Sequence, residues 1–266
     1  MTDRPGTKPR ARWARLGLAC LAAAALAGCA GAAPRLARGE LGSVYQTAPR
    51  LASFRFDGAP LAPADAFGPW AALTAQSGPD ARSLEACLAD KAVCATPDLV
   101  RFRRMMELAA GLAPREQLSL VHHYFNQIEW TNDTRDTWST LYHTAFSRMG
   151  DCEDIAIAKY QALRRLGWRA EDLRVLVGWD GEENDWHALL AVRLDGDTLV
   201  LDSVKGLQSP ALLSSVRLVY SISEHGVWDH APDFVPVGRE AERRLASERA
   251  ARLAATERRT NQGVLR

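Results

Sequence analysis

The chain has 266 residues, enough for one large domain or two small ones, and 47% of them are hydrophobic. The formal net charge is only +1, from 33 basic and 32 acidic residues, and this balance argues against a nucleic-acid-binding surface. The charge is unevenly distributed, because residues 1–28 carry five basic residues and one acidic residue. Without them the chain keeps 28 basic and 31 acidic residues, a net charge of −3.

The first 28 residues have the organisation of a bacterial export signal. A basic stretch over residues 1–15 is followed by the apolar stretch Leu16–Ala27, whose 12 residues are too few to span a membrane as a helix. The apolar stretch runs into Leu-Ala-Gly-Cys at residues 26–29, which resembles a lipobox, in which the cysteine is lipidated. We therefore predict a lipoprotein-type signal peptide over residues 1–28 and a periplasmic protein with a lipid on Cys29, anchored to the inner or outer membrane. An ordinary signal peptide with a coincidental cysteine is the alternative.

The rest of the chain divides into helices followed by strands. Residues 29–63 are rich in alanine, glycine and proline, and we expect a tether and irregular structure there. Hydrophobic spacing predicts helices over residues 64–77, 80–90, 98–111, 114–128 and 151–167, with Asp98 and Asp151 as N-caps. Alternation predicts strands over residues 173–179, 186–194, 198–202 and 214–222. This order indicates an α+β fold with one domain over residues 64–237, followed by a charged C-terminal helix or tail over residues 238–266.

The five cysteines fall into distinct groups. Cys20 is removed with the signal peptide, and Cys29 carries the lipid. Cys87 and Cys94 lie seven residues apart and fit a local disulfide, which an oxidising periplasm allows; two free buried thiols are the alternative. Cys152 then has no partner, so it is a candidate reactive thiol.

The position of Cys152 suits a nucleophile. It follows the predicted N-cap Asp151, where unpaired amide groups and the helix dipole favour an anion, and its own N–H is available to an oxyanion. His187 begins a predicted strand and is the candidate base, and Asp202 ends the next strand and is the candidate orienting acid. If Asp195-Gly196 forms a two-residue hairpin loop, Asp202 lies opposite Leu189 and diagonal to His187, within side-chain reach.

The motif around this cysteine resembles those of the bacterial transglutaminase-like cysteine proteinases. The resemblance is carried by Gly150–Asp154 (GDCED), by Ala156–Tyr160 (AIAKY), by His187-Ala188 and by Leu201-Asp202, and it covers about residues 68–230. It implies a papain-like or transglutaminase-like fold in which Cys152, His187 and Asp202 form the catalytic triad of a cysteine peptidase.

Within this family, the LapG-like periplasmic adhesin proteases imply further properties. Acids next to the cysteine, here Asp151, Glu153 and Asp154, would bind a calcium ion, since carboxylate oxygens suit calcium. The substrate would be a large surface adhesin in biofilm control, and an inner-membrane cyclic-di-GMP receptor would sequester the protease. Departures from the family pattern lie outside the triad: Ser203 follows the triad acid, and residues 137–141 (TWSTL) lack the usual proline.

Several alternatives remain open. Asp151 and Asp154 also have the spacing of a helix-capping pair, and Asp151 can both cap the helix and bind a metal ion. The acidic segment 180–185 either adds metal ligands or forms a solvated hairpin turn. His122 and His123 are assigned no role, and Trp138 suits a substrate cleft or a core equally well. The same triad would also serve a transglutaminase-like amidase or acyltransferase acting on cell-wall peptide. A non-catalytic, lipid-anchored binding module is the third possibility.

Overall fold

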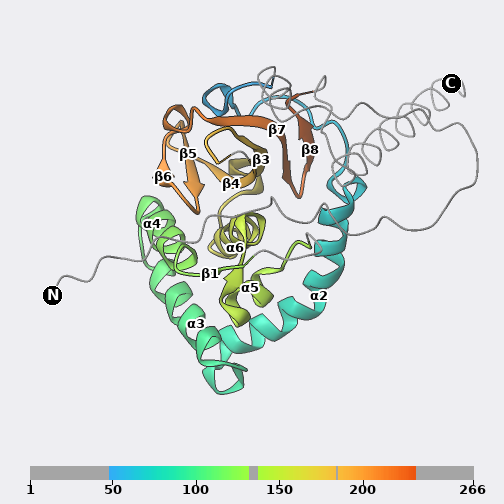
Figure 1. Cartoon of the computed structure of the whole chain (residues 1–266). Helices are drawn as coiled ribbons and strands as arrows, with labels where there is room; N and C mark the ends of the chain where they lie inside the picture. Colours follow the sequence, from blue (N-terminus) through green and yellow to red (C-terminus); the bar gives the residue numbers. More distant parts are fainter. Residues whose placement is uncertain (1–47, 132–136, 184, 232–266) are drawn as a thin grey trace, which may run out of the picture.

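The computed structural model describes residues 48–131, 137–183 and 185–231. The helices of this part are α2 (Gly68–Ala89), α3 (Pro97–Ala110), α4 (Pro114–Phe125), α5 (Leu141–Ser147) and α6 (Cys152–Arg165). The strands are β1 (Glu129–Trp130), β2 (Met149–Gly150), β3 (Leu173–Asp180), β4 (Asp185–Leu194), β5 (Asp197–Asp202), β6 (Gly206–Gln208), β7 (Val216–Ser223) and β8 (Gly226–Asp229). Figure 1 shows α2, α3 and α4 curving around α5 and α6, with the large sheet on the far side of α6. The predicted α+β, papain-like fold is confirmed.

The expectations for both ends of the chain lie outside the described residues. These are the signal peptide over 1–28, the lipidated Cys29, the first part of the tether and the C-terminal helix or tail over 238–266. Within the described ranges, no helix combines the length and the apolar character needed to cross a membrane.

The first predicted helices need correction. Residues 64–77 and 80–90 were expected to form two helices, whereas α2 is one helix of 22 residues with Pro79 inside it. Trp70, Leu73, Leu84 and Cys87 are buried along α2, on both sides of Pro79, so packing outweighs the backbone hydrogen bond that a proline removes.

The start of α3 also differs from the expectation. The N-cap is Thr96, whose side chain accepts the Leu99 N–H at 3.2 Å, while Asp98 pairs with Arg101 at 2.9 Å. The short helix α5 was not predicted at all.

A disulfide joins the end of α2 to the segment that leads into α3. Cys87 and Cys94 are bonded, with their Cα atoms 4.5 Å apart. The predicted local disulfide is confirmed, and the alternative of two free thiols is wrong. Cys152 is the free cysteine of the described residues, as expected.

The main sheet has six strands in the order β6-β5-β4-β3-β7-β8, and all its neighbours are antiparallel. The two-residue loop Asp195-Gly196 joins β4 to β5, with Leu194 paired to Asp197. Both loop residues have positive φ angles, 54° and 87°, as a type I′ hairpin requires. The premise used to align His187 with Asp202 is therefore correct. The predicted strand over 214–222 is β7, which pairs with the far side of β3, and the short strands β6 and β8 were missed.

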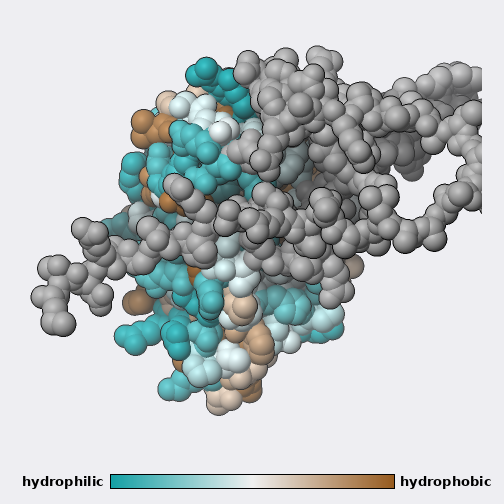
Figure 2. Space-filling model, viewed as in Figure 1, coloured by the Kyte–Doolittle hydropathy of each residue, from teal (hydrophilic) through white to brown (hydrophobic). Residues whose placement is uncertain are grey.

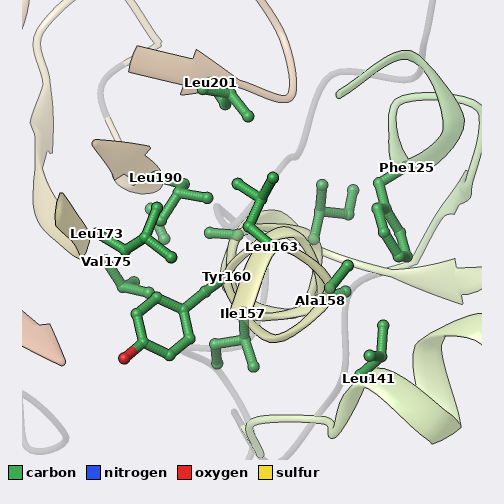
Figure 3. Packing of buried hydrophobic residues seen from close by; sticks show 14 of the residues in the cluster. Phe125, Leu141, Ile157, Ala158, Tyr160, Leu163, Leu173, Val175, Leu190 and Leu201 are labelled. Atoms are coloured by element: carbon green, nitrogen blue, oxygen red, sulfur yellow. The ribbon is translucent and has the colours of Figure 1, made fainter. Parts of the chain in front are cut away.

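Helix α6 lies at the centre of the hydrophobic core. In Figure 3, Tyr160 and Leu163 of α6 lie on the side of Leu173, Val175 and Leu190, whereas Phe125 and Leu141 lie on the opposite side of the helix. No residue of α6 is exposed. Because each fully buried large apolar side chain contributes about 1.5–3 kcal/mol, this packing fixes the helix relative to the sheet.

The other face of the sheet is covered by the segment before α2. Leu51 and Phe54 pack on Leu176, Leu189 and Val200 in a second cluster. Isolated bridges pair Arg50 with Arg217 and Ala62 with Val227, so this segment also covers the edge strand β8. The described surface in Figure 2 is mostly hydrophilic, with scattered hydrophobic residues, as expected for a sheet buried on both faces.

Candidate active site

The residues before Cys152 are held by a small parallel sheet that the sequence did not reveal. β1 pairs with β2, the Glu129 N–H donates to the Arg148 carbonyl at 2.9 Å, and the Thr131 N–H donates to the Gly150 carbonyl at 3.1 Å. Gly150 is required here, because a Cβ at this position would lie 2.8 Å from the Cβ of Asp154. The chain therefore enters α6 along a fixed path, with Cys152 as the first helical residue.

The three acids around the cysteine differ in their surroundings. Asp151 is the N-cap by position, but its side chain makes no capping hydrogen bond. Asp154 is buried and accepts the Ser139 N–H at 2.7 Å, which ties the segment before α5 to the start of α6. Glu153 accepts a hydrogen bond from the Cys152 thiol at 3.1 Å. The capping-pair interpretation of Asp151 and Asp154 therefore does not describe what these side chains do.

His187 and Asp202 form a buried pair. His187 Nε2 lies 3.1 Å from Asp202 Oδ1, and both side chains are buried at the facing ends of β4 and β5. Asp202 Oδ1 also accepts the Val204 N–H at 2.6 Å and the Lys205 N–H at 3.1 Å. Burial alone would raise the pKa of this carboxyl, but the bonds from His187, Val204 and Lys205 outweigh it and hold the pKa below its usual value.

The Cys152 sulfur lies next to the strand that carries the histidine. The backbone N–H of Ala188, the residue after His187, is close enough to the sulfur to oppose the rise in its pKa. Because His187 uses Nε2 toward Asp202, Nδ1 is the ring nitrogen left to take a proton from the thiol. The structure thus brings His187 and Asp202 into contact, and it packs α6, which begins at Cys152, against β4.

The thiol is nevertheless held in its protonated form. Burial raises the pKa of Cys152 well above the ordinary value, and the charges of Glu153 and Asp151 raise it further, while the Ala188 N–H opposes them. The helix start was expected to favour the thiolate. A helix N-terminus carries only about half an elementary charge, so burial together with the neighbouring acids outweighs it.

Burial and neighbouring acids also change the pKa of Glu153. Burial, followed by the charge of Asp151, raises the pKa of Glu153 to about 8. Neighbouring carboxylates suit a hard divalent cation such as calcium, because they offer oxygen ligands and negative charge. Within the described ranges, however, no group of three or more His, Cys, Asp or Glu side chains is arranged to hold a metal ion. Calcium prefers about six to eight oxygen ligands, so these acids would form only part of a site.

Two residues near Asp202 were given no functional role from the sequence. Asn126, at the C-terminal end of α4, donates from Nδ2 to the Asp202 carbonyl at 3.2 Å and lies 3.2 Å from His122 Nε2. His122, which was assigned no role, is buried behind this contact. Trp138 belongs to the core, where it contacts Phe67 and Trp70.

The acidic segment after β3 is partly the solvated turn that was expected, because residues 181–183 are an exposed turn. Asp180, the last residue of β3, is instead buried and accepts a hydrogen bond from Lys205 Nζ at 3.0 Å.

Residues 83–210 match the profile of the family described as bacterial transglutaminase-like cysteine proteinase BTLCP. The matched segment is a bacterial transglutaminase-like cysteine proteinase domain. It contains the disulfide, Cys152, His187 and Asp202. The domain is therefore that of a cysteine peptidase.

Solved structures support the same fold. The calcium-bound structure of Legionella pneumophila LapG is 24% identical with a TM-score of 0.50, covering 55% of this chain and 87% of LapG. Two further LapG structures, one of them EGTA-treated, are 22% identical with TM-scores of 0.51, covering 64% of this chain and 97% of LapG. No curated protein matches the sequence.

The lowered pKa of Asp202 predicts a pH-dependent contribution to stability. A carboxyl whose pKa is lower in the folded state stabilises the fold above its unfolded value of about 3.9, and this contribution is lost as the pH falls through the folded value. We expect Asp202→Asn to reduce the free energy of unfolding by about 1–3 kcal/mol at about pH 7 and by clearly less at about pH 3. Urea denaturation at both pH values measures this. Asp65→Asn, at an exposed carboxylate, is the control, and an equal loss at both pH values would contradict the assignment.

Proposed function

We propose that this chain is an exported, calcium-dependent cysteine endopeptidase with the triad Cys152, His187 and Asp202. The observation that carries the proposal is the buried 3.1 Å contact between His187 Nε2 and Asp202 Oδ1, since the strand that carries His187 packs against α6, which begins at Cys152. Membership of the domain in a cysteine proteinase family supports the same chemistry.

The proposed reaction uses the two ring nitrogens of His187 differently. Nδ1 takes the thiol proton as the Cys152 sulfur attacks the peptide carbonyl, and the new oxyanion is met by the Cys152 N–H. The protonated imidazole then donates that proton to the departing amine, which leaves a thioester on Cys152. Water, deprotonated by His187, hydrolyses the thioester and regenerates the thiol. Asp202 keeps Nε2 protonated and stabilises the imidazolium.

The proposed substrate is a large cell-surface adhesin or a similar envelope protein, and the proposed partner is an inner-membrane cyclic-di-GMP receptor. Both come from the LapG-like character of the motif, and the fold shared with LapG is consistent with them. In this setting the enzyme would release adhesin from the surface and so limit biofilm.

Cleavage of envelope protein tests the triad directly. Purified protein with calcium should cut at least one polypeptide of an outer-membrane or adhesin preparation, followed by gel electrophoresis and mass spectrometry of the fragments. Cys152→Ala and His187→Ala should lower the rate on the order of 10³-fold or more. His123→Ala, an exposed histidine on α4, is the matched control and should keep full activity. Muropeptide changes without proteolysis would instead indicate the amidase or acyltransferase. If wild type and Cys152→Ala behave identically in every assay, the result would indicate the non-catalytic binding module.

Calcium dependence is proposed from the acids at the start of α6. Asp151 and Glu153 would hold the ion, with Asp154 as a further candidate, and the bound ion would supply positive charge beside the thiol. The LapG structures described as calcium-bound and EGTA-treated support testing this metal first.

Removing calcium should affect stability as well as activity. A ligand at 100 times its Kd stabilises a protein by about 2.7 kcal/mol, or roughly 5–10 °C in Tm for a domain of this size. EGTA should therefore lower both the Tm and the cleavage rate, and added calcium should restore them. Asp151→Asn and Glu153→Gln should lose the calcium-dependent Tm rise, whereas the exposed control Glu171→Gln should keep it. Unchanged activity and Tm after chelation would exclude a calcium requirement.

Export and lipidation are proposed from residues 1–29 alone. The mature protein made in a bacterial host should begin at Cys29 and carry the mass of an acyl modification, measured by intact-protein mass spectrometry. Cys29→Ser should release it from the membrane fraction. An unmodified mature protein would rule out the lipid anchor, and an intact signal peptide would also rule out export.

A further inference from the structure

The triad acid lies on a short turn whose conformation depends on a lysine. Asp202 ends β5, and the Val204 and Lys205 amides close back onto its Oδ1 atom before β6 begins at Gly206. The Lys205 side chain leaves this turn and crosses to the end of β3. One residue therefore contacts the triad acid through its backbone and a second strand through its side chain.

The Lys205 ammonium group meets three oxygen atoms. Nζ lies 3.0 Å from Asp180 Oδ2, 2.8 Å from Glu182 Oε2 and 2.8 Å from Ser215 Oγ. Ser215 directly precedes β7, and its carbonyl accepts the Gly181 N–H at 3.0 Å. The ammonium group thus ties together the turn after β5, the end of β3 and the start of β7.

Asp180 makes this ion pair different from a surface pair. It is the last residue of β3, only 1% exposed, and its Oδ1 accepts the Glu182 N–H at 2.9 Å. Burial raises the pKa of Asp180, but the hydrogen bonds from Lys205, the Glu182 N–H and Ser215 outweigh it and lower this pKa. Burial lowers the pKa of Lys205, but its contacts with Glu182 and Asp180 outweigh it and raise this pKa. An ion pair exposed to solvent contributes little to stability. Removing one partner of a buried ion pair, in contrast, leaves the other charge buried and unpaired.

The strand held by Asp180 also aligns the histidine. β3 pairs with β4 so that Gly178 lies opposite His187 and Asp180 opposite Asp185. A Cβ on Gly178 would lie 2.3 Å from the Arg217 carbonyl oxygen, so β7 holds this part of β3 closely. The position of the Lys205 anchor is therefore rigid relative to His187.

We propose that Lys205 is a positioning residue of the triad: its ion pair with Asp180 fixes the turn that holds the Asp202 carboxylate against His187. This inference rests on the proposed function for its kinetic part only. Side chains of a catalytic site must be held within about 0.5 Å, and a displacement of about 1 Å can cost about 100-fold in rate. The Lys205 side chain contacts Asp180, and its backbone N–H contacts Asp202, so it acts on the triad through Asp202.

The kinetic test compares three variants on the polypeptide cut in the experiment above. Lys205→Met should lower kcat about 10- to 100-fold with KM within about two-fold of wild type, and Lys205→Arg should recover most of the loss. Arg193→Met is the matched control, because Arg193 pairs with Asp172 at 2.7 Å at the opposite end of β4. It should leave kcat unchanged. A wild-type kcat for Lys205→Met would overturn the proposal.

A second measurement separates positioning from folding and needs no catalysis. The hydrogen-bonded Nε2–H proton of His187, assigned by its absence in His187→Gln, is followed by NMR alongside the Tm. In Lys205→Met this resonance should shift or disappear at temperatures where the protein is folded. A variant with lower Tm but an unmoved resonance would show a purely structural role and overturn the proposal. A moved resonance in a protein that cleaves nothing would support the positioning role while the proposed function fails.

Discussion

Burial of α6 is the constraint on which the site depends. None of its residues is exposed, and it is packed between the large sheet on one side and the surrounding helices on the other. A helix held this firmly cannot rotate to adjust its first residue. The backbone position of Cys152 is therefore fixed, and the sheet must bring the base and the acid to it.

The sheet does so through a local signal that can be read in the sequence. Asp195-Gly196 favours a type I′ hairpin, and that turn sets the register of β5 on β4. With the register fixed, Asp202 follows Leu201 toward the end of β4 at which His187 lies. The helix start at Cys152 was equally predictable, since Asp151 precedes a clear amphipathic period.

The residues that hold the triad acid could not be predicted in this way. Lys205 meets Asp180 from 25 residues away, and Asn126 meets Asp202 from 76 residues away. Neither contact follows from a period or a spacing, because each depends on how separate elements pack. The single helix α2 was missed for a related reason: Pro79 signals a break, and only the burial of residues on both sides of it shows that the helix continues. Three-residue β6 offers too little pattern to be recognised.

Charged groups have opposite effects on catalysis in the two halves of the site, the sheet and the helix. On the sheet, hydrogen bonds hold the pKa of the Asp202 carboxyl below its usual value, so this group stays charged beside His187. On the helix, burial and then the charges of Glu153 and Asp151 raise the pKa of Cys152 and disfavour its thiolate. Catalysis requires the Cys152 thiol to transfer its proton to a ring nitrogen of His187. The acids beside the sulfur disfavour this transfer more than the helix start favours it. Acidic residues that weaken the nucleophile next to them make sense if their charge is neutralised when the enzyme works. The calcium ion proposed above would supply that positive charge, so the reactivity of the cysteine would depend on the ion more than on the helix start.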